Sequence, residues 1–408
     1  NVTDPDADGD ATTIPSLKVK VLGTTTTTVL LDKTLPIGNS FYRFDTDDTG
    51  ITIQIYPASN AEQNVNVAET SLKLATVATP ITNAPLSNLG LIVTEERFIF
   101  ALGSGGNSRK ISWCDREDRN TWTPAATNEA GDIELQTSGQ IMQAIRTRGQ
   151  TLILTDTDAH TARYQGPPYV YGFERVGTSC GTVTMRGAVD TDRGVFFIGQ
   201  ENFFLFNGNT VQTIKCDVHD YIFGDINTSQ QTKIWAMGIP QYGEVWWFYP
   251  SSDSTEINRY VAYDYNENHW MIGELSRTSG EARGVFRYPF MADYDGTHAN
   301  IKEHEVGYNV DSGAIFAETG PISIGTGENI MKVTGVIPDE VTQGDVNMTF
   351  KTRFHPNDVE TTHGPFTPAN PTDARFSGRQ VRMKVTGVKP ADWRVGVMRL
   401  EATIGGTR

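Results

Sequence analysis

The sequence has few cysteines and lacks any long hydrophobic run. Its three cysteines, Cys114, Cys180 and Cys216, are too few and too widely spaced for a disulfide framework. No CxxC or Cys/His spacing indicates a zinc site. No stretch approaches the ~18 consecutive apolar residues of a membrane-spanning helix, and the first residues lack the basic start and apolar core of a signal peptide. We therefore expect no membrane span.

Basic residues are also scarce. The chain of 408 residues has 34 Lys and Arg against 49 Asp and Glu, which gives a formal net charge of −15. A protein that grips the phosphate backbone without sequence preference needs a basic surface, so this balance argues against a conventional nucleic-acid binder. Hydrophobic residues make up 38% and charged residues 20%, which is enough apolar material for a core and too little charge for a disordered chain.

Motifs for catalysis and for metal binding are missing or incomplete. No GxSxG elbow, P-loop or HExxH sequence occurs. The stretch from Asp4 to Asp10 has the spacing of the first half of an EF-hand loop, but its twelfth position is Pro15, where calcium needs a bidentate Glu. His298 and His304 lie six residues apart, and no regular ligand spacing surrounds them. We therefore expect no metal, no cofactor and no catalytic residue.

What the sequence has instead is a series of short strand patterns. Near the N-terminus they occur at 17–22, 28–31 and 51–56, and the last alternates apolar and polar residues with period two. Asn207-Gly208 between two later apolar runs is a hairpin signal. From about residue 86, strand, turn and closing strand recur every ~40 to 50 residues, the range of β-propeller blades. The clearest apolar runs of this region lie at 97–102, 194–198, 202–206, 244–249 and 259–264.

The sequence thus predicts an all-β fold, a β-propeller core with additional small β domains at the N- and C-terminal ends. We expect an acidic β domain or insertion at 1–85, propeller blades at 86–307 and a β-sandwich-like domain at 308–408. Whether this last domain completes the propeller stays open. Residues 140–148 are the best candidate for a short helix and fit a strand equally well.

The two ends of the chain carry opposite charge. Residues 1–70 have ten acidic residues against four basic ones, and residues 371–408 have eight basic residues against three acidic ones. Opposite patches set the register between neighbouring subunits of a ring. The candidate subunit-contact residues are Arg375, Arg379, Arg382 and Arg394, with a solvated strand face as the alternative. The candidate acidic residues of a channel or interface surface are Asp4, Asp6, Asp8, Asp10, Asp45, Asp47 and Asp48.

The middle region leaves two questions open. The stretch Gly166-Pro-Pro-Tyr-Val-Tyr-Gly172, followed by residues 176–181, is either an exposed contact loop or a buried connector between blades. Propeller glycosidases use a pair of carboxylates at one rim, although acidic residues are also common in turns for reasons of turn chemistry alone. The carboxylates that could form such a pair are Asp156, Asp158, Asp190, Asp192, Asp264 and Glu267.

Several strings of the sequence resemble the tail hub family of short-tailed bacteriophages, also called tail nozzle or packaged-DNA stabilisation proteins. They are YQGPPYVYGFERVG at 164–177, DVHDYIFGDIN at 217–227, EVWWFYP at 244–250, RYVAYDY at 259–265, FSGRQVR at 376–382 and DWRVG at 392–396. The resemblance covers roughly residues 86–408. The first 85 residues do not match and are expected to be an insertion specific to this protein.

The resemblance implies a non-enzymatic structural protein of the virion tail, made in the host cytoplasm. Identical subunits would form a ring, expected to be a hexamer, around a DNA channel. The implied neighbours are a portal-side adaptor protein, tail fibre or tail-tip proteins, and double-stranded DNA that passes without sequence-specific binding. Such a ring extends the channel, helps to retain the packaged genome and passes it during ejection. An acidic lumen would repel phosphate and let DNA slide.

An alternative from another class stays open. An extracellular β-propeller lectin or glycosidase acting on polysaccharide would fit the same strand pattern. It would be a monomer with measurable glycan binding or hydrolysis, and the loop carboxylates would be its first candidate residues.

Overall fold

Short antiparallel strands make up most of the fold in this computed structural model, which describes residues 80–294, 298–308, 315–323, 327–338, 346–368, 371–387 and 393–407, together with five strands before residue 80. The described residues form 32 strands, one five-residue α-helix and two short 3-10 helices. The chain divides into two compact units, Asn1–Pro80 and Ile81–Arg408. The predicted all-β class is confirmed.

The N-terminal unit contains two small antiparallel sheets. One has three strands in the order β3-β2-β4, and the other pairs β1 with β5. The strand patterns predicted at 17–22, 28–31 and 51–56 correspond to β2, β3 and β4. The bounds are β1 (Val2–Thr3), β2 (Leu17–Gly23), β3 (Val29–Leu35), β4 (Ile51–Pro57) and β5 (Asn66–Val67).

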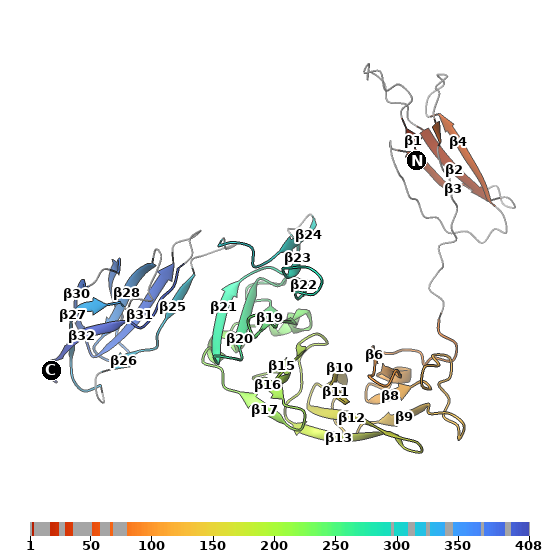
Figure 1. The fold of residues 1–408 in the computed structure, drawn as a ribbon, viewed down its shortest axis with the longest axis horizontal. Helices are drawn as coiled ribbons and strands as arrows, with labels where there is room; N and C mark the ends of the chain where they lie inside the picture. Colours follow the sequence, from red (N-terminus) through yellow and green to blue (C-terminus); the bar gives the residue numbers. More distant parts are fainter. Residues whose placement is uncertain are drawn as a thin grey trace. The chain divides into compact units, whose positions relative to one another are not determined.

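The second unit begins with four sheets of four strands, each a simple antiparallel meander in chain order (Figure 1). We number them the first to the fourth sheet. The first contains β6 (Gly90–Val93), β7 (Ile99–Leu102), β8 (Lys110–Trp113) and β9 (Gly131–Glu134); the second contains β10 (Ile141–Thr147), β11 (Gln150–Thr155), β12 (Asp158–Gly166) and β13 (Val170–Thr178). The third contains β14 (Ala188–Thr191), β15 (Gly194–Ile198), β16 (Phe203–Phe206) and β17 (Val211–Ile214); the fourth contains β18 (Trp235–Ile239), β19 (Glu244–Tyr249), β20 (Arg259–Asp264) and β21 (His269–Glu274).

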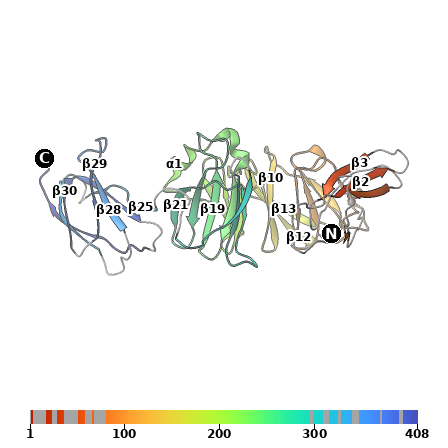
Figure 2. The same cartoon turned by 90° about the horizontal axis from the view of Figure 1, so that it is seen from above.

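A fifth sheet has three strands, β22 (Ser279–Glu281), β23 (Phe290–Tyr294) and β24 (Ala299–Glu303). The first strand of each sheet lies beside the first strand of the next, so that β6, β10, β14, β18 and β22 adjoin in turn. Within each sheet the strands run side by side, as Figure 2 shows for β12 with β13. Consecutive meanders whose first strands adjoin are blades, and the predicted β-propeller core is confirmed in this sense.

Each pair of neighbouring sheets encloses its own apolar core, because side chains alternate between the two faces of a strand. In β15, Phe197 packs with the side chains of the second sheet, whereas Phe196 packs with those of the fourth. Both rings are almost fully buried. Separate clusters likewise fill the space between the first and second sheets and between the fourth and fifth. The period-two pattern therefore supplies both faces of each interior sheet.

The few helical turns lie in connections between strands. The linker from the third to the fourth sheet contains α1 (His219–Phe223) and η2 (Thr228–Lys233), and η1 (Ser104–Gly106) follows β7. Ile222 of α1 is fully buried and belongs to the core between the third and fourth sheets. Residues 140–148, where helix and strand are equally compatible with the sequence, form β10.

The C-terminal part of the second unit is built from two sheets with a core of their own. One has the order β25-β31-β28-β29 with β26 also on β31, and the other has the order β30-β27-β32. In β28 and β30 buried side chains alternate with half-buried or exposed ones, as expected for two sheets packed face to face. The bounds are β25 (Phe316–Glu318), β26 (Ile322–Ser323), β27 (Met331–Ile337), β28 (Val346–Arg353), β29 (Thr361–Phe366), β30 (Thr372–Gly378), β31 (Gln380–Gly387) and β32 (Arg399–Ile404).

Candidate functional site

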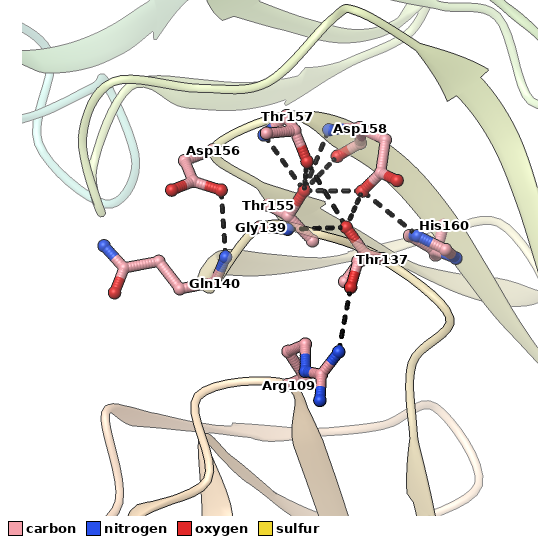
Figure 3. Close-up of polar contacts among 9 residues, drawn as sticks. All are labelled: Arg109, Thr137, Gly139, Gln140, Thr155, Asp156, Thr157, Asp158 and His160. Carbon is pink, nitrogen blue, oxygen red and sulfur yellow. Dashed lines mark hydrogen bonds and ion pairs between the residues drawn. The ribbon is translucent and has the colours of Figure 1, made fainter.

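A buried polar network joins the start of the second sheet to the turn between β11 and β12 (Figure 3). Asp158 Oδ1 accepts hydrogen bonds from Thr137 Oγ1 at 2.8 Å and from Thr155 Oγ1 at 2.6 Å. His160 Nε2 lies 3.2 Å from the same oxygen. All four side chains belong to buried residues. The Asp158 oxygen is thus occupied by side chains of its own blade.

Two glycines let the backbone close around this turn. A Cβ at Gly139 would lie 2.0 Å from Asp156 Oδ1, and a Cβ at Gly181 would lie 2.0 Å from the Asp156 carbonyl group. Such distances are too short for any side chain, so only glycine allows this approach. The neighbouring Cys180 donates its backbone N–H to the Thr157 carbonyl at 3.1 Å. Residues 177–181 are therefore packed against the turn.

The network accounts for two of the six candidate carboxylates. Asp158 is buried and bonded within the blade, and Asp156 Oδ1 accepts the backbone N–H of Gln140 at 2.9 Å. Asp264 has a similar role in the fourth sheet, since its Oδ1 accepts the N–H groups of Asn266 and Glu267. These three aspartates stabilise turns.

We expect His160 to make folding less favourable as the pH falls below about 6.5. Burial lowers the pKa of His160 in the folded chain, against the opposing effect of Asp158, whereas the unfolded chain keeps the ordinary pKa. The unfolded state then binds a proton more readily, and acid favours it. Urea unfolding at about pH 7.5 and about pH 5.5, for the wild type and His160→Gln, measures this effect. The wild type should lose more stability than the variant between the two values, and equal losses would contradict the expectation.

A shallow cleft of about 170 Å³ lies where turns of the second and third sheets meet. Arg148 from the β10–β11 turn lines it, together with Asp190, Asp192 and Arg193 at the end of β14. Burial raises the pKa of Asp190, although Arg148 opposes this effect. The cleft is the place where the structure brings two of the predicted carboxylates, Asp190 and Asp192, into one site. Its two guanidinium groups were not singled out by any motif.

Beneath the cleft the two sheets are joined by polar contacts. Gln150 is buried, donates through Nε2 to the Gly208 carbonyl at 2.8 Å and accepts from Arg163 Nε at 2.8 Å. These contacts fix the β10–β11 turn against the β16–β17 turn. The cleft thus presents donors and acceptors that could contact a hydroxyl-rich ligand.

The hairpin between β12 and β13 has a buried side and an exposed tip. Tyr171 is buried, and its hydroxyl group lies 2.8 Å from Thr94 Oγ1 and donates to Glu96 Oε2 at 2.9 Å in the first sheet. Tyr164 donates to Glu129 at 3.1 Å. Tyr169 at the tip is 78% exposed. This stretch therefore combines both alternatives that the sequence left open, a connector between blades and an exposed loop.

The four arginines predicted to contact a neighbouring subunit lie on different parts of the C-terminal sheets. Arg375 on β30 pairs with Asp373, and Arg379 between β30 and β31 donates to the Thr407 carbonyl. Arg382 on β31 forms ion pairs with Glu318 and Glu360. Arg394 lies exposed outside the long strands. Their contact with another subunit stays a prediction.

The other predicted positions add no site. The acidic residues of the first domain, Asp4, Asp6, Asp8, Asp10, Asp45, Asp47 and Asp48, lie outside the described residues. Across the part of the chain that the structure describes, no group of three or more His, Cys, Asp or Glu side chains is arranged to hold a metal ion. No described helix is long and apolar enough to cross a membrane.

Comparisons with known proteins give weak likenesses. No family model matches the chain, and no curated protein matches its sequence. The WD40 domain of Neurospora crassa Pan2 aligns at 16% identity with a TM-score of 0.26, over 40% of this chain and 46% of that one. PorZ of Porphyromonas gingivalis, a surface component of the type-IX secretion system, aligns at 6% identity with a TM-score of 0.30, over 68% and 33%. A glycoside hydrolase aligns at 10% identity with a TM-score of 0.23, over 76% and 89%. This chain spans less than half of the first two structures.

Proposed function

We propose that this protein is a structural subunit of a short-tailed bacteriophage tail, a ring-forming hub or nozzle. In this role it extends the DNA channel, helps to retain the packaged genome and passes it during ejection. Its partners are identical subunits, a portal-side adaptor protein, tail fibre or tail-tip proteins, and DNA held without sequence specificity. The starting point of the proposal is the resemblance of the sequence strings between residues 164 and 396.

The observation that carries the proposal is the exposure of large apolar side chains on strands at both ends of the blade series. Leu91 on β6 is 74% exposed and Ile301 on β24 is 79% exposed. Exposed apolar side chains that gather on one face mark interaction surfaces. A protein that works as part of a larger assembly requires such surfaces, whereas a monomeric enzyme does not.

The strings that carry the resemblance have packing roles that fit a structural protein. The string at 164–177 forms the hairpin that bonds the second sheet to the first through Tyr164 and Tyr171. The string at 244–250 supplies Trp247 and Tyr249, both almost fully buried between the third and fourth sheets. Both strings support the stack of blades.

We expect the purified chain to form rings and to occupy the tail of intact particles. Light scattering should give about six times the mass of one chain, and single-particle imaging should show a six-fold ring below the portal. The net charge of −15 should keep DNA from adhering to the ring at physiological salt. A monomer with no position in any particle would contradict the proposal.

The cleft between the second and third sheets favours a second candidate, an extracellular lectin or glycosidase. Asp190 and Asp192 share this cleft with Arg148 and Arg193. A carboxyl group with a raised pKa beside a second carboxylate is the pair that glycoside hydrolysis uses. Glycan binding by a monomer that is lost in Asp190→Asn and Asp192→Asn would favour this candidate over the ring.

A further inference from the structure

The outer faces of the first and fifth sheets differ from every face between them. Each interior face lies in an apolar core that two sheets share. In the first sheet, Leu91 and Val93 of β6 are 74% and 46% exposed. At the other end, Ile301 of β24 is 79% exposed and Phe286, in the loop before β23, is 64% exposed. The described residues of the chain leave these side chains uncovered.

Strand alternation shows that these side chains point away from the blade series. In β6, Ile92 packs in the core shared with the second sheet, so Leu91 and Val93 lie on the opposite face. In β23, Met291 packs in the core shared with the fourth sheet. Ala292, the next residue, is the register partner of Ile301 and therefore lies with it on the outer face. One sheet thus exposes its leading face and the other its trailing face.

These are the two kinds of face that meet at each interior contact. Every contact inside the series joins the trailing face of one sheet to the leading face of the next, with the first strands side by side. A fifth sheet placed before a first sheet would repeat this arrangement. The same apolar side-chain types would then be removed from water.

We propose that the outer face of the fifth sheet of one copy packs against the outer face of the first sheet of a second copy. The inference rests on the proposed ring and names the contact that builds it. The contact joins two different surfaces, so each copy keeps one free face of each kind at its ends. A contact of this heterologous type repeats from copy to copy and closes into a ring when the rotation allows.

Charges at the margins of the two faces are complementary. Glu95 follows Val93 at the end of β6 and is exposed. Arg283 and Arg287 flank Phe286 near the fifth sheet and are exposed as well. Opposite charges at the rim of an apolar contact select the orientation of the two copies more than they add affinity.

Cross-linking between copies tests the contact directly. Leu91→Cys and Ser279→Cys place thiols on β6 and β22, the strands that would adjoin. Both variants carry Cys216→Ser, because Cys216 is half-buried whereas Cys114 and Cys180 are buried. After the two single-cysteine variants are mixed and treated with a short bis-maleimide, we expect cross-linked dimers that contain one of each. Neither variant alone should give them in comparable yield.

The outcomes separate the contact from the proposed function. A chain that carries both new cysteines and cross-links only within itself would show that the two faces close on each other, and would overturn the inference. Rings seen by imaging without any cross-link would overturn the inference and leave the proposed function standing. A chain that stays monomeric at all concentrations would remove both.

Charge substitutions give a second measurement. Leu91→Asp and Ile301→Asp should each weaken self-association at least ~tenfold, because the contact would bury an unpaired carboxylate. Val359→Asp is the matched control, since Val359 is 93% exposed and lies in the C-terminal sheets. Circular dichroism confirms that each variant is folded. Unchanged self-association in both variants would contradict the proposal.

Discussion

Trp247→Ala should lower the free energy of unfolding by about 3–5 kcal/mol, the largest loss that we expect from a single substitution. Trp247 is fully buried between the third and fourth sheets. Its ring lies 4.8 Å from that of Phe203 and 6.3 Å from that of Trp270, centroid to centroid. Its Nε1 donates to the Gly187 carbonyl at 3.0 Å. The substitution leaves a cavity and an unpaired acceptor.

Urea unfolding followed by far-ultraviolet circular dichroism measures this loss. Trp247→Phe should lose less stability than the alanine variant, because most of the ring is kept and only the hydrogen bond disappears. Tyr242→Ala is the control, since Tyr242 lies in the β18–β19 turn and is 48% exposed. We expect that control to change stability by less than about 0.5 kcal/mol. Similar losses for Trp247→Ala and Tyr242→Ala would refute the packing that we describe.

Asp158→Ala should lower the free energy of unfolding by about 3 kcal/mol. The substitution removes the oxygen that accepts from Thr137 and Thr155 and that lies beside His160. These groups would stay buried without that acceptor, and each unsatisfied buried polar group costs about 1–3 kcal/mol. Thermal and urea unfolding of the variant check the expectation.

The neighbouring aspartate and an isosteric change provide the controls. Asp158→Asn keeps an oxygen in place and should retain most of the stability. Asp156→Ala removes an acceptor from an exposed turn, so we expect a loss of about 1 kcal/mol or less. The network as drawn in Figure 3 would be wrong if Asp156→Ala proved as damaging as Asp158→Ala.

Local pattern was sufficient to predict most strands. Alternation at 51–56 predicts β4, and Asn207-Gly208 lies at the turn between β16 and β17, as the hairpin signal requires. Both signals act over a few residues, through side-chain direction and turn geometry. The exchange of partners between distant residues does not enter into them.

The role of the carboxylates could not be predicted in the same way. Asp156 and Asp158 stand two residues apart in one turn, yet one is exposed and the other is buried. Burial of Asp158 depends on Thr137, which lies 21 residues away and is brought near by the folding of the second sheet. No local pattern contains that information.

The exposed end faces could not be predicted either. The apolar run at Leu91 resembles the run at Leu152 in composition, but Leu152 is fully buried between two sheets and Leu91 is exposed. A run of apolar residues predicts a strand with faces to bury, and it leaves open whether the described chain supplies a cover. The arrangement of sheets determines that.

The adjoining first strands described above make the energetics of the second unit nearly one-dimensional. Each blade gains most of its stabilisation from the blade before it and the blade after it, as the members of a linear array do. Cooperativity then spreads by nearest-neighbour coupling, and damage at one contact weakens chiefly the two blades that share it. An interior blade is coupled on two sides and a terminal blade on one, so fraying should begin at the ends of the array and reach the third sheet last.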